Sequence, residues 1–191
     1  MIMRNKPMVT KSVEAEPNDN WMKEENFIRV CDLREYDIPM ASGMYAIMVD
    51  DVDVLPKTFA DELRKRNHRL LYIGITNSTL RERLWSQELH AERPATFFRS
   101  IGALLGFEPR RGSMKDNTRN YKFTAEDNQK IVNWMSSHLM VSFIIESEDI
   151  ENKESRMIAT YKPIINISKN PYKMTELEML RKKCQNIAWG K

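Results

Sequence analysis

The sequence predicts a mixed α/β (α+β) domain in which three apolar runs of strand length alternate with segments of helical periodicity. The three runs are Gly43–Val49, Leu70–Ile75 and Leu139–Ile145. Continuous apolar runs of about four to eight residues between turn residues are typical of buried strands. The chain of 191 residues is long enough for one domain, and its apolar fraction of 41% is enough to form a core.

Helices are expected between and after these strands. Pro56 suits the first turn of one helix, where apolar residues recur at a spacing of four. Thr96 is expected to cap a second helix, and Thr124, with Asp127 three residues later, a third. The predicted helices are Pro56–Arg66, Thr79–Leu89, Ala95–Gly106, Thr124–His138, Asp149–Tyr161 and Thr175–Ala188.

The charge of the chain is unevenly distributed. Residues 63–122 carry 13 Lys and Arg against 5 Asp and Glu, although the whole chain has a net charge of only +3. A basic stretch of this kind suits a polyanion such as nucleic acid. An arginine-rich solvated surface would produce the same pattern.

Composition indicates a cytoplasmic protein. No apolar run approaches the length of a membrane span, and the first ten residues lack the apolar core of a signal peptide. Cys31 and Cys184 are far apart in the sequence, and we expect both to be free thiols.

Two short strings within the first two predicted strands each combine a tyrosine with a glycine. They are Gly43-Met44-Tyr45 and Tyr72-Ile73-Gly74. Because a glycine lets other groups approach the backbone closely, each string can hold a phenol beside an accessible backbone. A tyrosine on a buried strand is, by itself, more often a core residue with a bonded hydroxyl.

Further residues downstream have the chemistry that phosphodiester cleavage needs. Arg83 lies in Leu80-x-x-Arg83, and Glu154 begins the pattern Glu154-x-x-x-Ile158-x-x-x-x-Pro163-x-x-Asn166. The planar fork of an arginine suits phosphate oxygens, and a carboxylate with water ligands suits Mg²⁺. Considered singly, these would be surface or turn residues.

Taken together and in this order, the residues resemble the GIY-YIG nuclease superfamily over about Gly43–Ile167. The resemblance implies a small three-stranded antiparallel sheet flanked by helices, with the active site along the sheet. It also implies a divalent-metal-dependent endonuclease, a hydrolase that cleaves phosphodiester bonds in DNA with Mg²⁺ or Mn²⁺.

The resemblance implies a role for each matching residue. Arg83 corresponds to the catalytic arginine, Glu154 to the metal-binding glutamate and Asn166 to an asparagine that helps to order the site. Tyr45 is expected to act as the general base, with Tyr72 as its partner or as a group that positions water. Because a free phenol has a pKa of about 10, either tyrosine must be activated, and the choice between them stays open.

Two positions depart from the family pattern. The two tyrosines are 27 positions apart, where the family usually has a short turn, so Asp50–Arg69 is expected to be an insertion. The family often has a histidine or tyrosine one helical turn after the arginine, and this chain has Gln87 there. His90, seven positions after Arg83, is the nearest candidate for that role, and it could equally be a residue at the helix end.

The resemblance also divides the chain. We expect an N-terminal arm over residues 1–40, a nuclease domain over 41–169 with insertions at 50–69 and 92–137, and a C-terminal helix within 170–191. No separate recognition domain is visible, so specificity must come from the insertions, a protein partner or a second copy of the chain. Contacts with nucleic acid are expected at Gly74, Arg81, Arg99, Arg110 and Arg111.

Three classes of function follow from the sequence. The leading one is a metal-dependent endonuclease acting on DNA, although the residues do not separate DNA from RNA. The second is a nucleic-acid-binding module that has lost or weakened its catalysis. The third is a protein-interaction domain with an incidental basic stretch, which predicts no salt-dependent affinity for DNA.

Overall fold

The computed structural model describes residues 19–93, 95–114 and 120–191. Parts of the expected N-terminal arm and of the expected insertion at 92–137 fall outside these described residues. The strands are β1 (Ile28–Arg29), β2 (Gly43–Val49), β3 (Leu70–Thr76) and β4 (Leu139–Ile145). The helices are α1 (Lys57–Arg66), the π-helix η6 (Arg81–Leu89), α2 (Thr96–Leu104), α3 (Ala125–His138), α4 (Ile150–Tyr161) and α5 (Thr175–Trp189). Short 3₁₀ turns are η1 (Asp19–Met22), η2 (Glu24–Asn26), η3 (Val30–Asp32), η4 (Glu35–Asp37) and η5 (Val52–Val54).

The sheet is antiparallel, with the strand order β1-β4-β2-β3. The predicted fold class is confirmed with one correction, since the sheet has four strands and not three. The extra strand β1 pairs Ile28 with Val141 at the edge of β4. It is held there because Phe27 and Val30, on either side of it, are buried. Two residues are too few for the period of a strand to show in a sequence.

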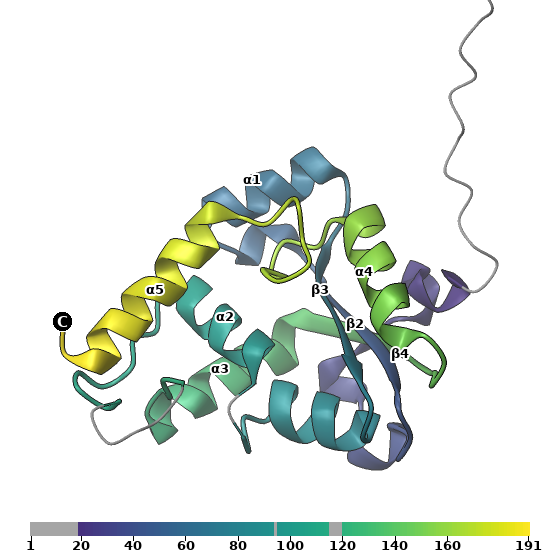
Figure 1. The fold of residues 1–191 in the computed structure, drawn as a ribbon, viewed down its shortest axis with the longest axis horizontal. Helices are drawn as coiled ribbons and strands as arrows, with labels where there is room; N and C mark the ends of the chain where they lie inside the picture. Colours follow the sequence, from purple (N-terminus) through teal and green to yellow (C-terminus); the bar gives the residue numbers. More distant parts are fainter. Residues whose placement is uncertain (1–18, 94, 115–119) are drawn as a thin grey trace, which may run out of the picture.

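Strand β2 is the centre of the sheet, and all seven of its residues are buried. Its side chains alternate between two cores, so Tyr45 and Ile47 face the larger core and Met44 and Ala46 the smaller one. Figure 1 shows the reason: helices α2, α3 and α5 lie on one side of the sheet and α4 on the other. A strand covered on both faces has a continuous apolar sequence, as the run over Gly43–Val49 does.

All six predicted helices are present, and the cap of α3 is confirmed. The hydroxyl oxygen of Thr124 accepts a hydrogen bond from the amide of Asp127 at 3.1 Å. This bond satisfies one of the amides that the first turn of a helix leaves without an intrahelical partner.

The predicted cap of α2 is wrong. Thr96 is the first residue of this helix and not its cap. The amides of Phe97 and Phe98 donate instead to the Oε2 atom of Glu88, at 3.1 and 3.3 Å. A carboxylate from the preceding helix therefore caps α2, which the local sequence of α2 does not reveal.

The helix predicted at Thr79–Leu89 is a π-helix over Arg81–Leu89. At its end the amide of His90 donates to the carbonyl oxygen of Trp85, five residues earlier, at 3.1 Å. π-helical turns are rare and are found frequently at functional sites. This geometry brings together side chains five positions apart, among them Arg83 and Glu88.

The segment before β2 belongs to the core. Its buried apolar side chains contact both faces of the sheet, and the hydroxyl of Ser142 in β4 donates to the carbonyl oxygen of Trp21 at 2.6 Å. The buried residues of this segment are Trp21, Phe27, Val30, Leu33 and Ile38.

Two expectations from composition can be compared with the structure. Cys31 is exposed and Cys184 is buried, and both are free, as predicted. Within the described parts of the chain, no helix is both long enough and apolar enough to cross a membrane.

Candidate active site

The two motif tyrosines lie on the same face of the sheet. In the antiparallel register of β2 and β3, Tyr45 is opposite Gly74 and Ile47 is opposite Tyr72. Side chains directly opposite each other point to the same face, so Tyr45 and Tyr72 are diagonal neighbours. Their ring centroids are 6.2 Å apart. The long connection between the tyrosines in the sequence therefore does not separate them in space.

Gly74 leaves the space that the Tyr45 phenol occupies. A Cβ atom at this position would lie 2.4 Å from Cζ of Tyr45 and 2.8 Å from Cε1 of Tyr72. Both contacts are far shorter than atoms tolerate, so a side chain here would displace a tyrosine. Gly74 of the Tyr72-Ile73-Gly74 string therefore leaves room for the side chain of Tyr45 in the Gly43-Met44-Tyr45 string.

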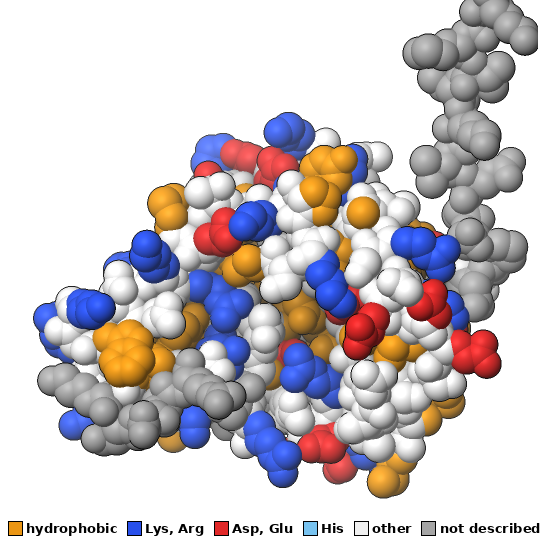
Figure 2. Space-filling view, in the orientation of Figure 1, with side chains coloured by type: hydrophobic (Ala, Val, Ile, Leu, Met, Phe, Trp, Pro, Cys, Tyr) orange, Lys and Arg blue, Asp and Glu red, His pale blue; other side chains and the backbone are white. Residues whose placement is uncertain are grey.

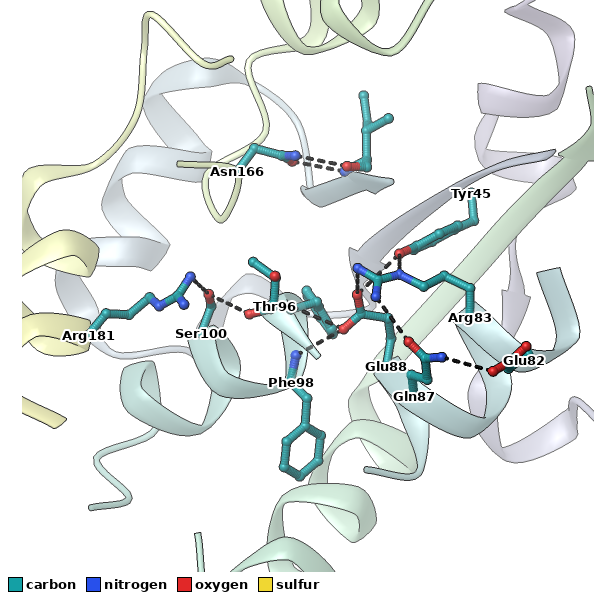
Figure 3. A network of polar contacts seen from close by, with 12 residues as sticks. Tyr45, Glu82, Arg83, Gln87, Glu88, Thr96, Phe98, Ser100, Asn166 and Arg181 are labelled. Atoms are coloured by element: carbon teal, nitrogen blue, oxygen red, sulfur yellow. Dashed lines mark hydrogen bonds and ion pairs between the residues drawn. The ribbon is translucent and has the colours of Figure 1, made fainter. Parts of the chain in front are cut away.

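Arg83 is the centre of a polar network (Figure 3). Its Nε donates to the hydroxyl oxygen of Tyr45 at 3.3 Å, and its Nη1 donates to Oε1 of Gln87 at 3.0 Å. Its Nη2 forms an ion pair with Oε1 of Glu88 at 2.9 Å. The guanidinium is thereby held in one orientation beside both tyrosines.

Glu88 is the residue that sequence reasoning missed. It is 0% exposed, and its carboxylate accepts hydrogen bonds from the hydroxyl of Tyr45, at 3.2 Å, and from the amides of Phe97 and Phe98 at the start of α2. A regular α-helix turns about 100° per residue, so Arg83 and Glu88 would point about 140° apart on it. Only the π-helix places them together, and the sequence carries no clear signal for that turn.

Burial keeps the protons on both phenols. It raises the pKa of Tyr45 well above its ordinary value, and the negative charge of Glu88 raises it further. Burial and Glu88 raise the pKa of Tyr72 as well. Burial also raises the pKa of Glu88, against the opposing effect of Arg83. At neutral pH a tyrosine here is therefore a neutral phenol, and it can accept a proton only if its own proton moves to an acceptor.

Tyr72 and Glu154 line one cleft of about 610 Å³, together with Asn166. The cleft is also lined by Lys169 after α4 and by Arg181 and Lys182 of α5, against the two carboxylates of Glu154 and Glu178. Figure 2 shows Lys and Arg side chains around the hollow between α4 and α5. A cleft with this charge suits an anionic ligand.

Tyr45 and Arg83 are not among the described residues that line this cleft. Tyr45 is 0% exposed, whereas Tyr72 is 8% exposed and belongs both to the cleft wall and to the tyrosine pair. Tyr72 is thus the link between the cleft and the network around Arg83.

Glu154 reaches the cleft from α4 and is 12% exposed. Its Oε2 atom is 2.9 Å from Nζ of Lys169. Within the described residues, no group of three or more His, Cys, Asp or Glu side chains forms a metal site. The residues present fit a hard cation that takes one carboxylate here and completes its shell with water and phosphate oxygens, as Mg²⁺ commonly does. Such a cation would compete with Lys169 for Oε2 of Glu154.

Asn166 braces the outer edge of β3. Its Oδ1 accepts from the amide of Ile73 at 2.9 Å, and its Nδ2 donates to the carbonyl oxygen of Ile73 at 2.8 Å. Beside it, the amide of Ile165 donates to the carbonyl oxygen of Leu71 at 2.8 Å. Asn166 thus imitates a neighbouring strand and fixes the backbone between Tyr72 and Gly74.

The side chain of His90 contacts Trp85. Its Nδ1 lies 2.9 Å from the carbonyl oxygen of Trp85, and the two rings are 4.1 Å apart. The side chain that contacts Arg83 one turn later is Gln87, at the position where the family often has a histidine or tyrosine.

The residues predicted to contact nucleic acid lie in different surroundings. Arg81 donates to the carbonyl oxygen of Ile38 at 3.0 Å, and Arg111 to that of Gly190 at 3.3 Å. Arg110 is exposed, and Arg99 is buried in α2. These side chains do not gather at the cleft, and their contact with nucleic acid stays a prediction.

Comparison with known protein families matches residues 43–183 to the GIY-YIG catalytic domain. The match covers well over half of the chain, so the chain belongs to the GIY-YIG family, as the motifs predicted. Members of this family are generally nucleases, which implies nucleic acid as the substrate. No curated protein and no solved structure matches the chain.

Proposed function

We propose that this protein is a divalent-metal-dependent endonuclease that hydrolyses phosphodiester bonds in DNA. The observation that carries the proposal is that Tyr72 and Glu154, from β3 and α4, line the same basic cleft. A chain that only packed its core would have no need of a carboxylate in a cleft lined by Lys169, Arg181 and Lys182.

Each motif residue has a role that its position supports. Glu154 would hold the metal, which when bound supplies Lewis-acid stabilisation of the charge on the phosphoryl and leaving oxygens. Arg83 would neutralise charge on the phosphoryl oxygens from behind Tyr72. Asn166 positions Tyr72 by bracing Ile73.

The two tyrosines would have different roles. Tyr72 lines the cleft and is therefore the phenol placed to contact the attacking water. Tyr45 accepts from Arg83 and donates to Glu88, so its hydroxyl orients the arginine. We therefore assign the contact with water to Tyr72 and a positioning role to Tyr45, in place of the general-base role expected for Tyr45.

A second function has one observation in its favour. The Glu154 carboxylate is paired with Lys169, and Arg83 is paired with Glu88. A module that binds nucleic acid without cutting it would keep both pairs intact. It would show salt-dependent binding and no cleavage.

Plasmid cleavage distinguishes these functions. We would incubate supercoiled plasmid with the wild type, Glu154→Gln and Arg83→Ala, each with Mg²⁺, with Mn²⁺ or with EDTA. Glu146→Gln is a matched control, because Glu146 also pairs with a lysine, Lys153, but does not line the cleft.

Cleavage by the wild type and by Glu146→Gln, absent in the other two variants and in EDTA, supports the endonuclease. Equal cleavage by all four proteins would indicate a contaminant. Salt-dependent binding by the wild type without cleavage would replace the proposal with the binding module.

A further inference from the structure

Arg99 in α2 is buried without the partners that a guanidinium needs. It is 6% exposed, and neither its Nε nor its Nη1 atom has a hydrogen-bond partner within the described structure. Apart from Nε2 of His68, no other buried side-chain nitrogen or oxygen in the described residues is in this condition. Buried polar groups are almost always hydrogen-bonded, so an unpaired one requires an explanation such as a bound ion or water.

The nearby acidic group is already fully engaged. Glu88 acts on the charge of Arg99, but its carboxylate accepts from Arg83, from Tyr45 and from two amides of α2. Burial lowers the pKa of Arg99, and the positive charge of Arg181 lowers it further. The surroundings of Arg99 therefore contain more positive than negative charge.

Arg99 lines a cavity of about 100 Å³ between α2 and the start of α3. Arg93 and Lys122 line the same cavity from the surface, and Asn128 adds an amide group. Glu92 is the one acidic residue among its described lining residues. Arg93 is already paired with Glu82 at 3.1 Å, so Arg99, Lys122 and Asn128 supply the available donors, and Arg99 and Lys122 outnumber the one lining carboxylate.

The size and the donors of the cavity define the ligand. A water molecule takes about 30 Å³ of liquid volume, so the cavity holds a few waters or one compact oxyanion and excludes a nucleoside. The guanidinium fork matches the oxygens of a phosphate. We propose that this cavity binds a phosphate group, with Arg99 as its buried ligand and Lys122 at its mouth.

Inorganic phosphate and the backbone of a nucleic acid share this chemistry. That the phosphate belongs to a nucleic acid rests on the proposed function, whereas the phosphate site itself does not. Bound there, a backbone phosphate would be held by α2, the helix that Glu88 joins to Arg83 and Tyr45. The cavity would then fix the strand at a point outside the cleft of Glu154.

The first experiment uses inorganic phosphate alone, without metal or DNA. We would follow the thermal midpoint Tm of the full chain against phosphate concentration, at ionic strength held constant with chloride. The wild type should show a saturable rise in Tm, because a ligand that binds only the folded state stabilises it. Arg99→Met, which keeps an unbranched stem of four atoms and removes the guanidinium, should abolish that rise. Arg64→Gln, which removes an exposed arginine of α1, should retain it.

Lys122→Ala keeps the test decisive if Arg99→Met does not fold. Lys122 is exposed, so its substitution leaves the core intact, and phosphate should bind about fivefold more weakly without it. Equal Tm responses in the wild type, Lys122→Ala and Arg99→Met would overturn the proposal and leave a water-filled cavity. So would the absence of any response in the wild type.

A labelled DNA oligonucleotide in EDTA identifies the source of the phosphate. If the site holds a backbone phosphate, Arg99→Met should weaken binding about tenfold and reduce the salt dependence by about one phosphate contact. If Arg99→Met abolishes phosphate binding but leaves DNA affinity unchanged, the ligand is free phosphate. Neither measurement requires cleavage, so a failure of the nuclease proposal cannot be mistaken for a failure of this one.

Discussion

Arg83 and Glu88 form an ion pair of 2.9 Å although they are five positions apart on one helix. The π-helical turn of η6 makes this possible, and Glu88 extends the contact by capping α2. The pair therefore couples Arg83, to which we assign a catalytic role under the proposed function, to helix α2, which lies outside the motifs. Four predictions follow from this arrangement and from the cleft beside it.

Removal of the Glu88 carboxylate should strongly destabilise the fold. Glu88→Ala leaves Nη2 of Arg83 and two amides of α2 without their acceptor, and breaking a buried pair costs about 3–5 kcal/mol. Glu88→Gln should lose less, because its amide oxygen can still cap α2. Urea denaturation measures the free energy of unfolding. Glu62→Gln, which removes a carboxylate that pairs with Arg66 but is 24% exposed where Glu88 is 0% exposed, is the control and should cost about 0–1 kcal/mol. Equal losses at the two positions would contradict the arrangement.

Substitution of Asn166 should loosen the edge of β3 at Ile73. Asn166→Ala leaves the amide and carbonyl of Ile73 unpaired, which costs about 1–3 kcal/mol for the buried groups. The amide of Ile73 should then exchange with deuterium faster than amides at the centre of β2, as read by NMR. Asn133→Ala, at an exposed position of α3, should leave this exchange unchanged. If the amide of Ile73 exchanges equally slowly in Asn166→Ala, the two hydrogen bonds from Asn166 do not stabilise this edge of β3.

Stability should fall at high pH in a way that depends on Tyr121. Burial raises the pKa of this phenol to about 12, from about 10 in an unfolded chain. The folded state therefore holds the proton more tightly, so this contribution is fully present below pH 10 and is lost as the pH rises through 12. A folded-state pKa that is higher by about two than the unfolded-state pKa corresponds to about 2–3 kcal/mol of the free energy of unfolding.

The measurement is the free energy of unfolding in urea at about pH 8 and about pH 12. Tyr121→Phe should show a smaller decline than the wild type, because the other tyrosines contribute equally to both proteins. Tyr36→Phe serves as the control, since Tyr36 is exposed. A decline in Tyr121→Phe as steep as in the wild type would mean that the phenol ionises normally.

Removal of Lys169 should strengthen metal binding at Glu154. Nζ of Lys169 forms an ion pair with the carboxylate that a cation would bind. A partly exposed ion pair contributes about 0–1 kcal/mol of interaction free energy. Lys169→Gln should therefore tighten Mn²⁺ binding by up to about fivefold, as measured by electron paramagnetic resonance without DNA. Lys153→Gln, which removes a lysine paired with Glu146 outside the cleft, should have no such effect. Weaker Mn²⁺ binding in Lys169→Gln would contradict competition at this carboxylate.

Much of the fold could be predicted from local patterns. The apolar run of Gly43–Val49 indicated a strand covered on both faces, and β2 is that strand. Thr124 indicated the start of α3. The strand β1 escaped prediction because two residues have no period, and the cap of α2 escaped because its acceptor comes from another helix.

The sequence by itself determined which residue types are present and in what order: two tyrosine–glycine strings, an arginine, a glutamate and an asparagine, enough to indicate the family. Only the tertiary structure decided how they meet. It placed Tyr72 and Glu154 on one cleft, enclosed Tyr45 behind them, and joined Arg83 to a glutamate that no motif contains. The physical reason is that strand and helix periods depend on neighbouring residues, whereas strand register, a π-helical turn and a buried charge depend on what packs against them from elsewhere in the chain.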